Sequence, residues 1–553
     1  MTHSTLPSDR STLSASNSKA PSIASIARED IFAVTETVKE PTLHDDHNAD
    51  KDRIDDLSIY ASIKEDSFVD ADFLVRFDEN DPENPLNWSL TKRWVITLVA
   101  AFLILNATIA SSVPAGVLPQ MQVHFGFSRE VGALCLSLFV LGFAVGPILW
   151  GPMSEDFGRQ PVSLISFPLF IGTQIGCALS PNTASILIFR FLGGVFGASY
   201  LTTSGGIIAD MFDGKLRGRA LGAFSLAPFA GPSLAPLISG WMSVAGVGWQ
   251  WVFWMQSIYG GVCLFLVLVA QPETYKPILL VHKARLMRKQ TKDGRWWAPL
   301  ERKHHPLPQR IQLILTRPFQ MLATEPMLVA LTVYLSFAYG VIYLLFEAYP
   351  IVFTVGHQLN AGISSLTYLP VPIGGAMACI LYFIFFDPKY QHAVETYHPL
   401  PPPPEYRLPT SLYGSVLMPI SFFWFAWTSY PSISFWAPMM AGLPLGMAVV
   451  LLYLGLYSYM FDAYTNYAAS ALAATVITRS FFGAGFPLFA TQMYEKLTPR
   501  WASTLLAIVS LVMAPVPFVL QKYGPTLRAR SKNAPQSVRS VGMNRRLSKE
   551  QSV

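Results

Sequence analysis

The sequence is poor in charged residues and in cysteine. Asp, Glu, Lys and Arg make up 14% of the 553 residues, whereas about a quarter is usual for a soluble domain. The four cysteines fall in apolar segments without metal-ligand spacing, so we expect neither a disulfide nor a metal site. Hydrophobic residues make up 51%, and the mean hydropathy is +0.36. This composition excludes an ordinary soluble protein and indicates a chain that crosses a membrane many times.

Several functional motifs are also missing. No GxxxxGK[ST] phosphate loop occurs, which argues against an ATP-driven pump. The ten histidines form no Ser/His/Asp set or metal cluster, so we expect no enzyme and no cofactor. Lys and Arg are dispersed among loops rather than gathered on one soluble domain, which argues against nucleic acid as a partner. We expect no signal peptide, so the first apolar run must itself direct membrane insertion.

Long apolar runs are what the sequence does contain. Runs of about twenty residues, enough to cross roughly 30 Å of hydrocarbon as a helix, come in two groups of six. The first group lies at about 94–113, 131–150, 160–179, 184–209, 218–240 and 251–270. The second lies at about 327–347, 362–386, 411–428, 434–459, 468–490 and 500–521. We therefore expect an all-α membrane protein with twelve transmembrane helices in two six-helix bundles.

The apolar runs divide the chain into five parts. The two bundles are expected at 93–271 and 327–522. Residues 1–92 are rich in Ser, Thr, Asp and Lys, which is typical of a disordered tail. A polar, basic central loop at 272–326 is either an amphipathic helix on anionic lipid or a plain tether. Residues 523–553 are expected to form a second tail.

The distribution of positive charge predicts the orientation. Loops around Arg159, Arg217 and Lys283 are basic, whereas those around 180–185, 240–250 and 430–433 have no Lys or Arg. Because short cytoplasmic loops retain positive charge, we predict that both tails and the central loop are cytosolic. The expected location is the cell membrane, multi-pass, with the vacuolar membrane as the alternative.

One short turn is expected to act as a conformational hinge. The segment from Gly151 to Gln160 joins the second and third apolar runs. Gly151 and Gly158 permit a tight turn and close helix approach, while Glu155, Asp156 and Arg159 can pair with one another or cap the helix ends.

Two membrane segments carry unusual residues. Arg190 stands inside the fourth run, where a charge needs a partner, a hydrated cavity or a route by which it can snorkel to the interface. The small residues after it, Gly193, Gly194 and Gly197, allow a neighbouring helix to pack closely. In the fifth run, Gly231 and Pro232 belong to a proline-rich segment that should be kinked, closely packed and turned toward the bundle interior.

The turn from Gly151 to Gln160, the Arg190 segment of the fourth run and the proline-rich segment of the fifth run resemble, in this order, the signatures of the major facilitator superfamily. Its fungal 12-spanner drug:proton antiporter branch is a closer match, through the segments Asn84–Ser89, Trp249–Trp251 and Pro272–Pro277. The resemblance implies two bundles that rock about a central cavity, and export driven by the inward proton gradient. The partners it implies are a small-molecule substrate, protons and the lipid bilayer, and we expect a monomer.

The chain departs from the family pattern in two places. In the turn, Glu155 replaces the usual Asp, Asp156 stands at a commonly basic position, and Gln160 replaces the last cation. In the fifth helix, Ala235 and Pro236 stand where antiporters of the superfamily commonly have glycine. The second departure weakens the case for strict antiport.

Residues that combine polarity with membrane depth are candidates for transport and coupling. They are Asn106, Arg190, Glu347 and Arg479. Glu347 could bind and release a proton in a pocket of low dielectric, or could be an interfacial carboxylate. Next to it, Tyr339, Tyr343 and Phe346 recur at helical spacing and form either an aromatic substrate wall or ordinary packing.

The function expected is a transmembrane efflux transporter. Its substrates would be small hydrophobic, amphipathic or cationic compounds: drugs, toxins or secondary metabolites such as glycolipids. The mechanism expected is proton antiport with alternating access. A polyamine or nutrient permease or facilitator, not coupled to protons, is the first alternative. A non-transporting membrane sensor with signalling tails is the second.

Overall fold

The computed structural model describes residues 73–302, 307–398, 401–531 and 533–534. Within these residues the regular structure is helical, apart from one isolated bridge between Leu74 and Trp297. Side-chain caps set several helix starts. The side chains of Ser128 and Asn182 accept hydrogen bonds from backbone N–H groups at the starts of α5 (Arg129–Asp156) and α7 (Thr183–Met211). These bonds satisfy donors that a helix leaves free in its first turn.

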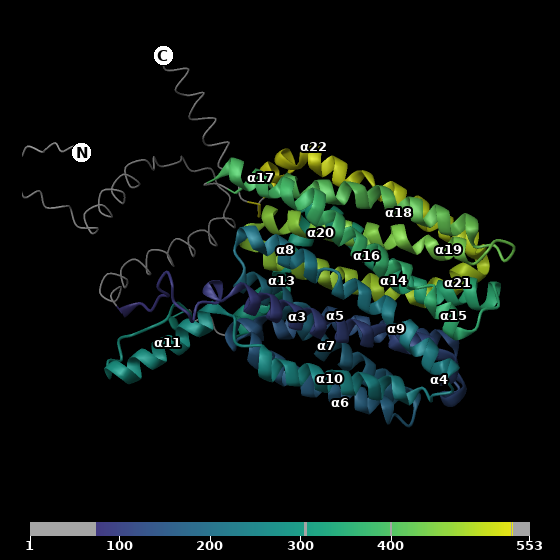
Figure 1. Ribbon diagram of the computed structural model, residues 1–553, viewed down its shortest axis with the longest axis horizontal. Coiled ribbons are helices and arrows are strands. Elements are labelled where there is room, and N and C mark those ends of the chain that lie inside the picture. The colour runs from purple at the N-terminus through teal and green to yellow at the C-terminus, as the bar shows by residue number, and fades with distance from the viewer. Residues whose placement is uncertain (1–72, 303–306, 399–400, 532, 535–553) are drawn as a thin grey trace, which may run out of the picture. The chain divides into compact units, whose positions relative to one another are not determined.

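The first group of helices runs from residue 90 to residue 270 and lies in the lower, purple-to-teal part of Figure 1. Its members are α3 (Leu90–Ser112), α4 (Leu118–Phe125), α5 (Arg129–Asp156), α6 (Arg159–Ala178), α7 (Thr183–Met211), α8 (Gly214–Phe224), α9 (Ala227–Val244) and α10 (Gln250–Ala270). A connector follows, with α11 (Lys276–Thr291), α12 (Pro299–Arg302) and α13 (Leu307–Thr324).

The second group runs from residue 326 to residue 530, in the green-to-yellow part of Figure 1. Its members are α14 (Pro326–Tyr349), α15 (Ala361–Leu366), α16 (Pro370–Leu381), α17 (Asp387–Tyr397), α18 (Leu408–Thr428), α19 (Trp436–Met440), α20 (Gly442–Ala463), α21 (Ala468–Met513) and α22 (Pro515–Arg530). The last helix extends eight residues into the tail expected from 523 onward.

All twelve predicted apolar runs fall on helices. Ten helical stretches are long and apolar enough to cross a membrane, among the residues searched. The stretch Ala468–Arg530 holds two predicted runs and breaks at Thr498, whose φ of 65° is not helical. The break divides this stretch into two helices, which raises the count from ten to eleven. With α18, which is not among the ten, the total is the twelve helices that the sequence predicts.

Close helix contacts recur at corresponding places in the two groups. Gly142 and Gly194 bring α5 and α7 together, and a Cβ on either glycine would collide with the backbone of the other helix. Gly374 and Gly446 do the same between α16 and α20. Small residues permit such contacts in membranes, where helix association depends on close packing rather than on hydrophobic burial.

The two groups meet through a few helix pairs. α5 packs against α21, and α9 packs against α15 and α16. α14 is buried along almost its whole length and contacts α21, α20 and α9. A side chain on α14 can therefore be reached from both groups of helices.

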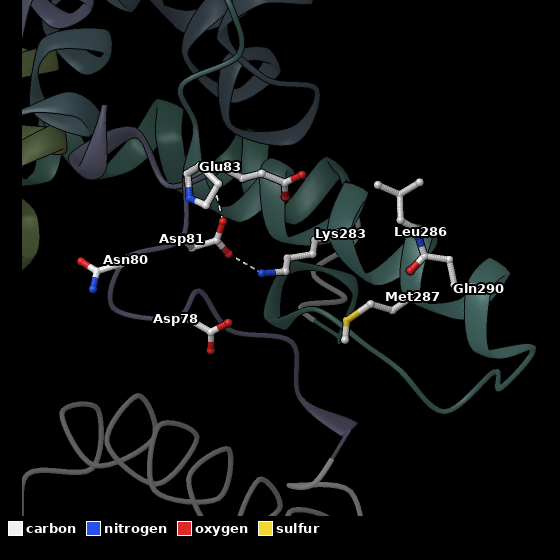
Figure 2. Close-up of a pocket in the computed structure, with 9 residues that line it drawn as sticks. Asp78, Asn80, Asp81, Glu83, Lys283, Leu286, Met287 and Gln290 are labelled. Atoms are coloured by element: carbon white, nitrogen blue, oxygen red, sulfur yellow. Dashed lines mark hydrogen bonds and ion pairs between the residues drawn. The ribbon is translucent and has the colours of Figure 1, made fainter. Parts of the chain in front are cut away.

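A short segment before α3 packs on the connector. Val75 is buried in a cluster with Val281 and Ala284 of α11, and the backbone of residues 73–75 bonds to Trp297. Asp81 forms an ion pair with Lys283 beside an open pocket of about 620 Å³ (Figure 2). Residues 73–81, which the sequence assigns to the tail of residues 1–92, are thus packed on α11 and Trp297, while Trp88 packs against Ile96 and Met211 of the first group. Residues 1–72 lie outside the described residues.

Candidate functional site

The predicted hinge between α5 and α6 is shorter than expected. α5 continues through Gly151 to Asp156, so the turn itself consists of Phe157 and Gly158. Gly158 has a φ of 103°, and a Cβ there would collide with the Glu273 carboxylate. Gly151 makes no comparable close approach, since a Cβ would lie 3.9 Å from Thr202. Only the second of the two glycines is therefore required by the turn.

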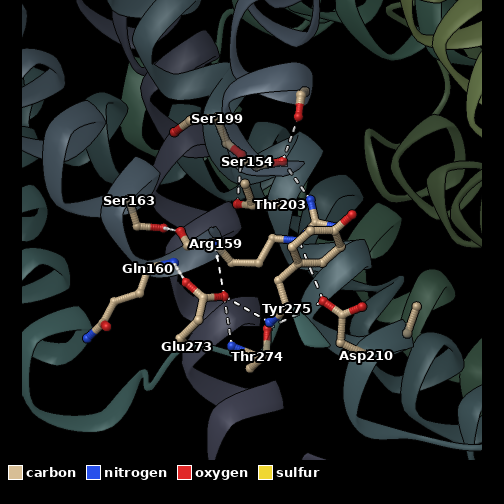
Figure 3. Close-up of polar contacts among 12 residues, drawn as sticks. Ser154, Arg159, Gln160, Ser163, Ser199, Thr203, Asp210, Glu273, Thr274 and Tyr275 are labelled. Atoms are coloured by element: carbon tan, nitrogen blue, oxygen red, sulfur yellow. Dashed lines mark hydrogen bonds and ion pairs between the residues drawn. The ribbon is translucent and has the colours of Figure 1, made fainter. Parts of the chain in front are cut away.

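Arg159 joins this turn to the end of α7. Its Nε lies 3.5 Å from Asp210 Oδ2, and its Nη1 donates to Ser154 Oγ at 2.6 Å (Figure 3). Its guanidinium also lies 4.8 Å from the centre of the Tyr275 ring. Glu155 has no hydrogen bond within the described part of the chain. The acidic partner of Arg159 given by the structure thus comes from α7, which the turn's own sequence does not reveal.

Glu273 completes the cluster from the connector after α10. Its carboxylate accepts hydrogen bonds from the backbone N–H groups of Arg159 at 3.0 Å and Gln160 at 3.1 Å (Figure 3). It also accepts from the backbone of Thr274 and Tyr275. A carboxylate at the start of a helix satisfies free donors and interacts favourably with the helix dipole. Glu273 therefore fixes α6 to the connector. We call the end of the bundle that holds this cluster the turn end.

Arg190 is fully buried and does not snorkel. Its Nε donates to the Cys135 carbonyl at 2.7 Å, and its two Nη atoms donate to Ala110 and Ser111 carbonyls at 2.6 Å each. Pro114 lacks an N–H, so the Ala110 carbonyl has no helical donor four residues later. The guanidinium supplies that donor and holds α3, α5 and α7 together.

The proline-rich helix α9 shows the same principle. Pro236 removes the donor for the Pro232 carbonyl, and Ser112 Oγ of α3 donates to that carbonyl at 3.0 Å. At Gly231, α9 lies so close to α3 that a Cβ would collide with Thr108. The predicted close packing of α9 toward the interior is present, with Gly231 and Pro232 both against α3.

Asn106 belongs to a buried polar group inside the first set of helices. Its Nδ2 lies 3.5 Å from Cys263 Sγ, and Gln256 Nε2 lies 3.5 Å from its carbonyl. The Asn106 Oδ1, the Gln256 Oε1 and both amide atoms of Gln174 are buried without a hydrogen-bond partner. The two glutamines were not predicted, because an isolated Gln in an apolar run carries no local signal of its neighbours.

The predicted aromatic residues are buried at the contact between the two groups of helices. Tyr343 OH and Ser111 Oγ of α3 share a hydrogen bond of 2.9 Å, and Tyr339 OH lies 3.3 Å from Tyr343 OH. Phe346 packs against Tyr343 with ring centres 5.6 Å apart. These three aromatic side chains therefore lie in the interior, not against lipid.

Arg479 and Glu347 lie at different levels of α21 and α14. The Arg479 guanidinium is 4.9 Å from the centre of the Tyr339 ring and 5.9 Å from that of Tyr453. Glu347 is 7% exposed and accepts a hydrogen bond of 3.1 Å from Thr491 of α21. Of the four polar candidates, Arg479 and Glu347 thus lie on α21 and α14, the helices of the second group that contact α5 and α9, whereas Asn106 lies within the first group. Arg190 also lies within the first group, where its Nη2 donates a hydrogen bond to the Ser111 carbonyl.

Ion pairs close both ends of this contact. At the turn end, Arg219 Nε lies 2.7 Å from Asp387 of α17. At the opposite end, Arg129 of α5 lies 2.8 Å from Glu495 of α21. A void of only about 10 Å³ lies between the groups, lined by residues that include Phe229, Ile342 and Val450. A substrate could enter this region only if the two groups moved apart.

Comparison with known proteins supports the same architecture. Residues 100–487 match the sequence profile of the Major Facilitator Superfamily. The chain is 41% identical over 462 residues to the "Major facilitator superfamily multidrug transporter mdrA" of Aspergillus fumigatus, covering 83% of this chain and 75% of that one. It is 40% identical over 472 residues to the "MFS-type efflux pump MFS2" of Trichophyton rubrum, covering 85% and 78%.

Two further matches give context. A "Citrinin biosynthesis cluster MFS transporter" of Monascus ruber is 39% identical over 474 residues, covering 84% of this chain and 93% of that one. Among solved structures, the proton:xylose symporter XylE bound to 6-bromo-6-deoxy-D-glucose aligns with a TM-score of 0.57 at 16% identity, covering 79% of this chain and 96% of that one. The structural likeness concerns the fold alone.

Proposed function

Because the chain belongs to the Major Facilitator Superfamily, whose members are transporters and not enzymes, we propose that it exports small molecules across a membrane by alternating access. Relatives at about 40% identity are named multidrug transporters and efflux pumps, which supports the export direction. A relative named for a citrinin cluster supports secondary metabolites as one substrate group.

The contact between the two groups of helices is the observation that carries this proposal. It contains polar and aromatic side chains from both groups, joined by the Ser111 to Tyr343 hydrogen bond, and ion pairs close it at both ends. Opening either end would expose the same interior to one side of the membrane, which is what alternating access requires. The structure represents the state closed at both ends.

The interior favours hydrophobic or amphipathic substrates with a flat ring. Tyr339, Tyr343 and Phe346 offer ring faces and edges to such a molecule. Cationic substrates, which the sequence also suggests, are less well matched beside Tyr339, because the charged side chain next to that ring, Arg479, is itself a cation.

Proton antiport through Glu347 is the coupling that we propose. The carboxylate is buried between α14 and α21, and these helices contact α9 and α5 of the first group, so its surroundings change when the groups move apart. Protonation of a buried carboxylate removes the cost of burying its charge, so the proton and the conformation can be linked. Thr491 of α21 donates a hydrogen bond to this carboxylate and so connects it to the helix that packs against α5.

We place the turn end in the cytosol, with both tails on that side, in the cell membrane or the vacuolar membrane. The connector with α11 and the basic loops around Arg159, Arg217 and Lys283 support this orientation, because cytoplasmic loops retain positive charge. A monomer is sufficient, since both groups of helices that form the interior come from one chain.

The first experiment measures efflux of a panel of labelled compounds from cells or vesicles, with and without an uncoupler. Efflux of at least one compound that stops when the gradient collapses is expected. The Glu347→Gln variant should lose gradient-dependent efflux, whereas Glu79→Gln, at an exposed position before α3, should retain it. Equilibration without the gradient would instead identify a facilitator and remove the coupling role of Glu347.

A further inference from the structure

Arg479 differs from the other buried arginines, Arg190 and Arg528, in the partners that surround its guanidinium. Arg190 has three backbone carbonyls around its guanidinium, and Arg528 has the Glu405 carboxylate at 2.9 Å. Arg479 is 8% exposed, its Nε has no hydrogen-bond partner, and no carboxylate pairs with it among the residues described. A guanidinium stays charged in proteins, so this charge is buried beside the rings of Tyr339 and Tyr453, with the Tyr453 hydroxyl as a neutral hydrogen-bond partner.

Glu347 cannot neutralise Arg479 in this state. It bonds to Thr491, which stands twelve residues after Arg479 on the same helix. At 1.5 Å per residue, twelve residues of helix span about 18 Å, well beyond the reach of an ion pair. Leaving a charge unpaired in a membrane interior costs several kcal/mol, so a side chain in this position calls for a functional partner.

Tyrosines surround Arg479 on two sides. Tyr339 comes from α14, and Tyr453 and Tyr457 come from successive turns of α20, with their ring centres 5.3 Å apart. Tyr457 OH is buried and, like Arg479 Nε, has no hydrogen-bond partner in the part of the chain that the structure describes. Two unsatisfied polar groups therefore lie among aromatic rings, and both can donate a hydrogen bond to an anion.

The first group of helices provides the remaining wall. Phe229 of α9 packs on the Tyr453 ring with centres 4.5 Å apart. When the two groups separate, this contact breaks and frees the ring face of Tyr453 beside the guanidinium. A planar aromatic molecule could take the place of the Phe229 ring and bring an attached acidic group to Arg479.

We propose that the region between Tyr339, Tyr453, Tyr457, Arg479 and Phe229 is a binding site for an aromatic carboxylate. Arg479 and Tyr457 bind the carboxylate, and Phe229 and Tyr453 bind the ring. The assignment rests on the transport function proposed above and names its substrate class, which is anionic and not cationic. An anion supplies the charge that Arg479 lacks, whereas a cation would be repelled by it.

Three probes with the same ring test this charge preference: 1-naphthoate, 1-naphthamide and 1-naphthylmethylammonium. Binding to the full-length protein in nanodiscs is measured by calorimetry at pH 7, with empty nanodiscs as the blank for partition into lipid. The carboxylate should bind at least about tenfold more tightly than the amide, because a hydrogen bond between two charged groups contributes that much affinity or more. The ammonium should bind most weakly, because Arg479 repels it.

Substitutions then assign the preference to Arg479. Arg479→Gln should bring the affinity for naphthoate down to that for naphthamide, with little change for the amide. Arg479→Lys should keep a smaller preference, because the ammonium retains the charge without the planar fork. Arg500→Gln is the matched control, since Arg500 follows the break of α21 at Thr498 and stacks on Trp427 at 3.8 Å, outside the site. If Arg479→Gln does not fold, the test is decided by the order in which wild type binds the three probes and by the smaller preference expected for Arg479→Lys.

Equal binding of the three probes, no measurable binding of the carboxylate, or an unchanged preference in Arg479→Gln would each overturn the assignment. Because binding is measured without a gradient, this outcome is separate from the transport test. Gradient-dependent efflux without a charge preference would leave the transport function standing and remove the anion site. A charge preference without efflux of any compound would leave the anion site standing and remove the transport function.

Discussion

At the scale of single residues, Arg190 satisfies the Ala110 carbonyl that its own helix leaves free. Replacing Arg190 by Ala removes three hydrogen bonds and leaves the Ala110 carbonyl without a donor, because Pro114 has no N–H. We expect Arg190→Ala to insert into the membrane, to lose transport and to lose about 3 kcal/mol or more of stability. Transport assays and thermal unfolding of the purified variant check this.

The Arg190→Lys variant separates charge from geometry. One ammonium cannot reach three carbonyls at the positions that the planar guanidinium serves, so stability should fall between wild type and Ala. Wild-type stability and full transport in Arg190→Ala would show that the carbonyls find other donors and that this arginine is dispensable.

At the scale of helices, the contact between α5 and α7 depends on Gly194. A Cβ there would collide with the Phe139 carbonyl, which is backbone and cannot rotate away. We expect Gly194→Ala to cost about 1–3 kcal/mol by forcing the two helices apart. The measurement is the shift of the thermal unfolding midpoint.

Gly205 on the same helix is the matched control. A Cβ at Gly205 would have no atom within 4 Å. Gly205→Ala should be neutral or stabilise the protein by about 0.5–1 kcal/mol, because alanine favours the helix. Equal midpoints for the two variants would mean that the close contact of α5 and α7 carries no steric constraint.

The packing of residues 73–81 on α11 should depend on pH in a defined direction. The hydrogen bond from Lys283 is the main cause that lowers the pKa of Asp81 below its ordinary value of 3.8. A lowered folded-state pKa means that the stabilisation is fully present above the ordinary value and is lost as the pH falls through the lowered one. The protection factors of this segment in hydrogen–deuterium exchange, which are corrected for the intrinsic exchange rate at each pH, should therefore be constant between about pH 5 and 7 and should fall only in stronger acid.

Lys283→Met should speed exchange of residues 73–81 already at pH 7, because it removes the cation that Asp81 pairs with. Lys289→Met, at an exposed position of the same helix, should not. If both variants exchange like wild type, the apolar contacts of Val75 hold the segment without help from the ion pair.

At the scale of the whole molecule, the two closing ion pairs are unequal. Arg129 and Glu495 are both about half exposed, so their pair should contribute at most about 1 kcal/mol. Asp387 is only 2% exposed, and removing Arg219 leaves its carboxylate without that cation. We expect Arg219→Gln to raise the population open at the turn end roughly fivefold or more, and Arg129→Gln to change the opposite end much less.

Spin labels measure this difference directly. The exposed positions Phe157 and Phe461, one in each group of helices, can carry labels after substitution by Cys, since the four native cysteines are buried. Longer distances in Arg219→Gln are expected. Identical distance distributions in Arg219→Gln and wild type would mean that helix packing, not this ion pair, holds the turn end closed.

The helices and the family were predictable because their signals are local. A run of about twenty apolar residues specifies a membrane helix whatever surrounds it, and all twelve runs lie on helices. The predicted family is confirmed by the match of residues 100–487. The packed residues 73–89 were not predicted, because their few apolar side chains are ordered by contact with distant helices: Val75 with α11, and Trp88 with α3 and α7.

The partners of polar residues were decided by tertiary structure. In the sequence, Arg190 and Arg479 look alike, since each is one arginine inside an apolar run. Pro114 predicts a freed carbonyl on the first helix, yet only the folded protein brings Arg190 to that carbonyl and places Arg479 among tyrosines instead. The length of the apolar runs in the sequence thus determined the twelve helices. Contacts between side chains of distant helices determined that the charge of Arg190 is satisfied by carbonyls and that the charge of Arg479 is available to a ligand.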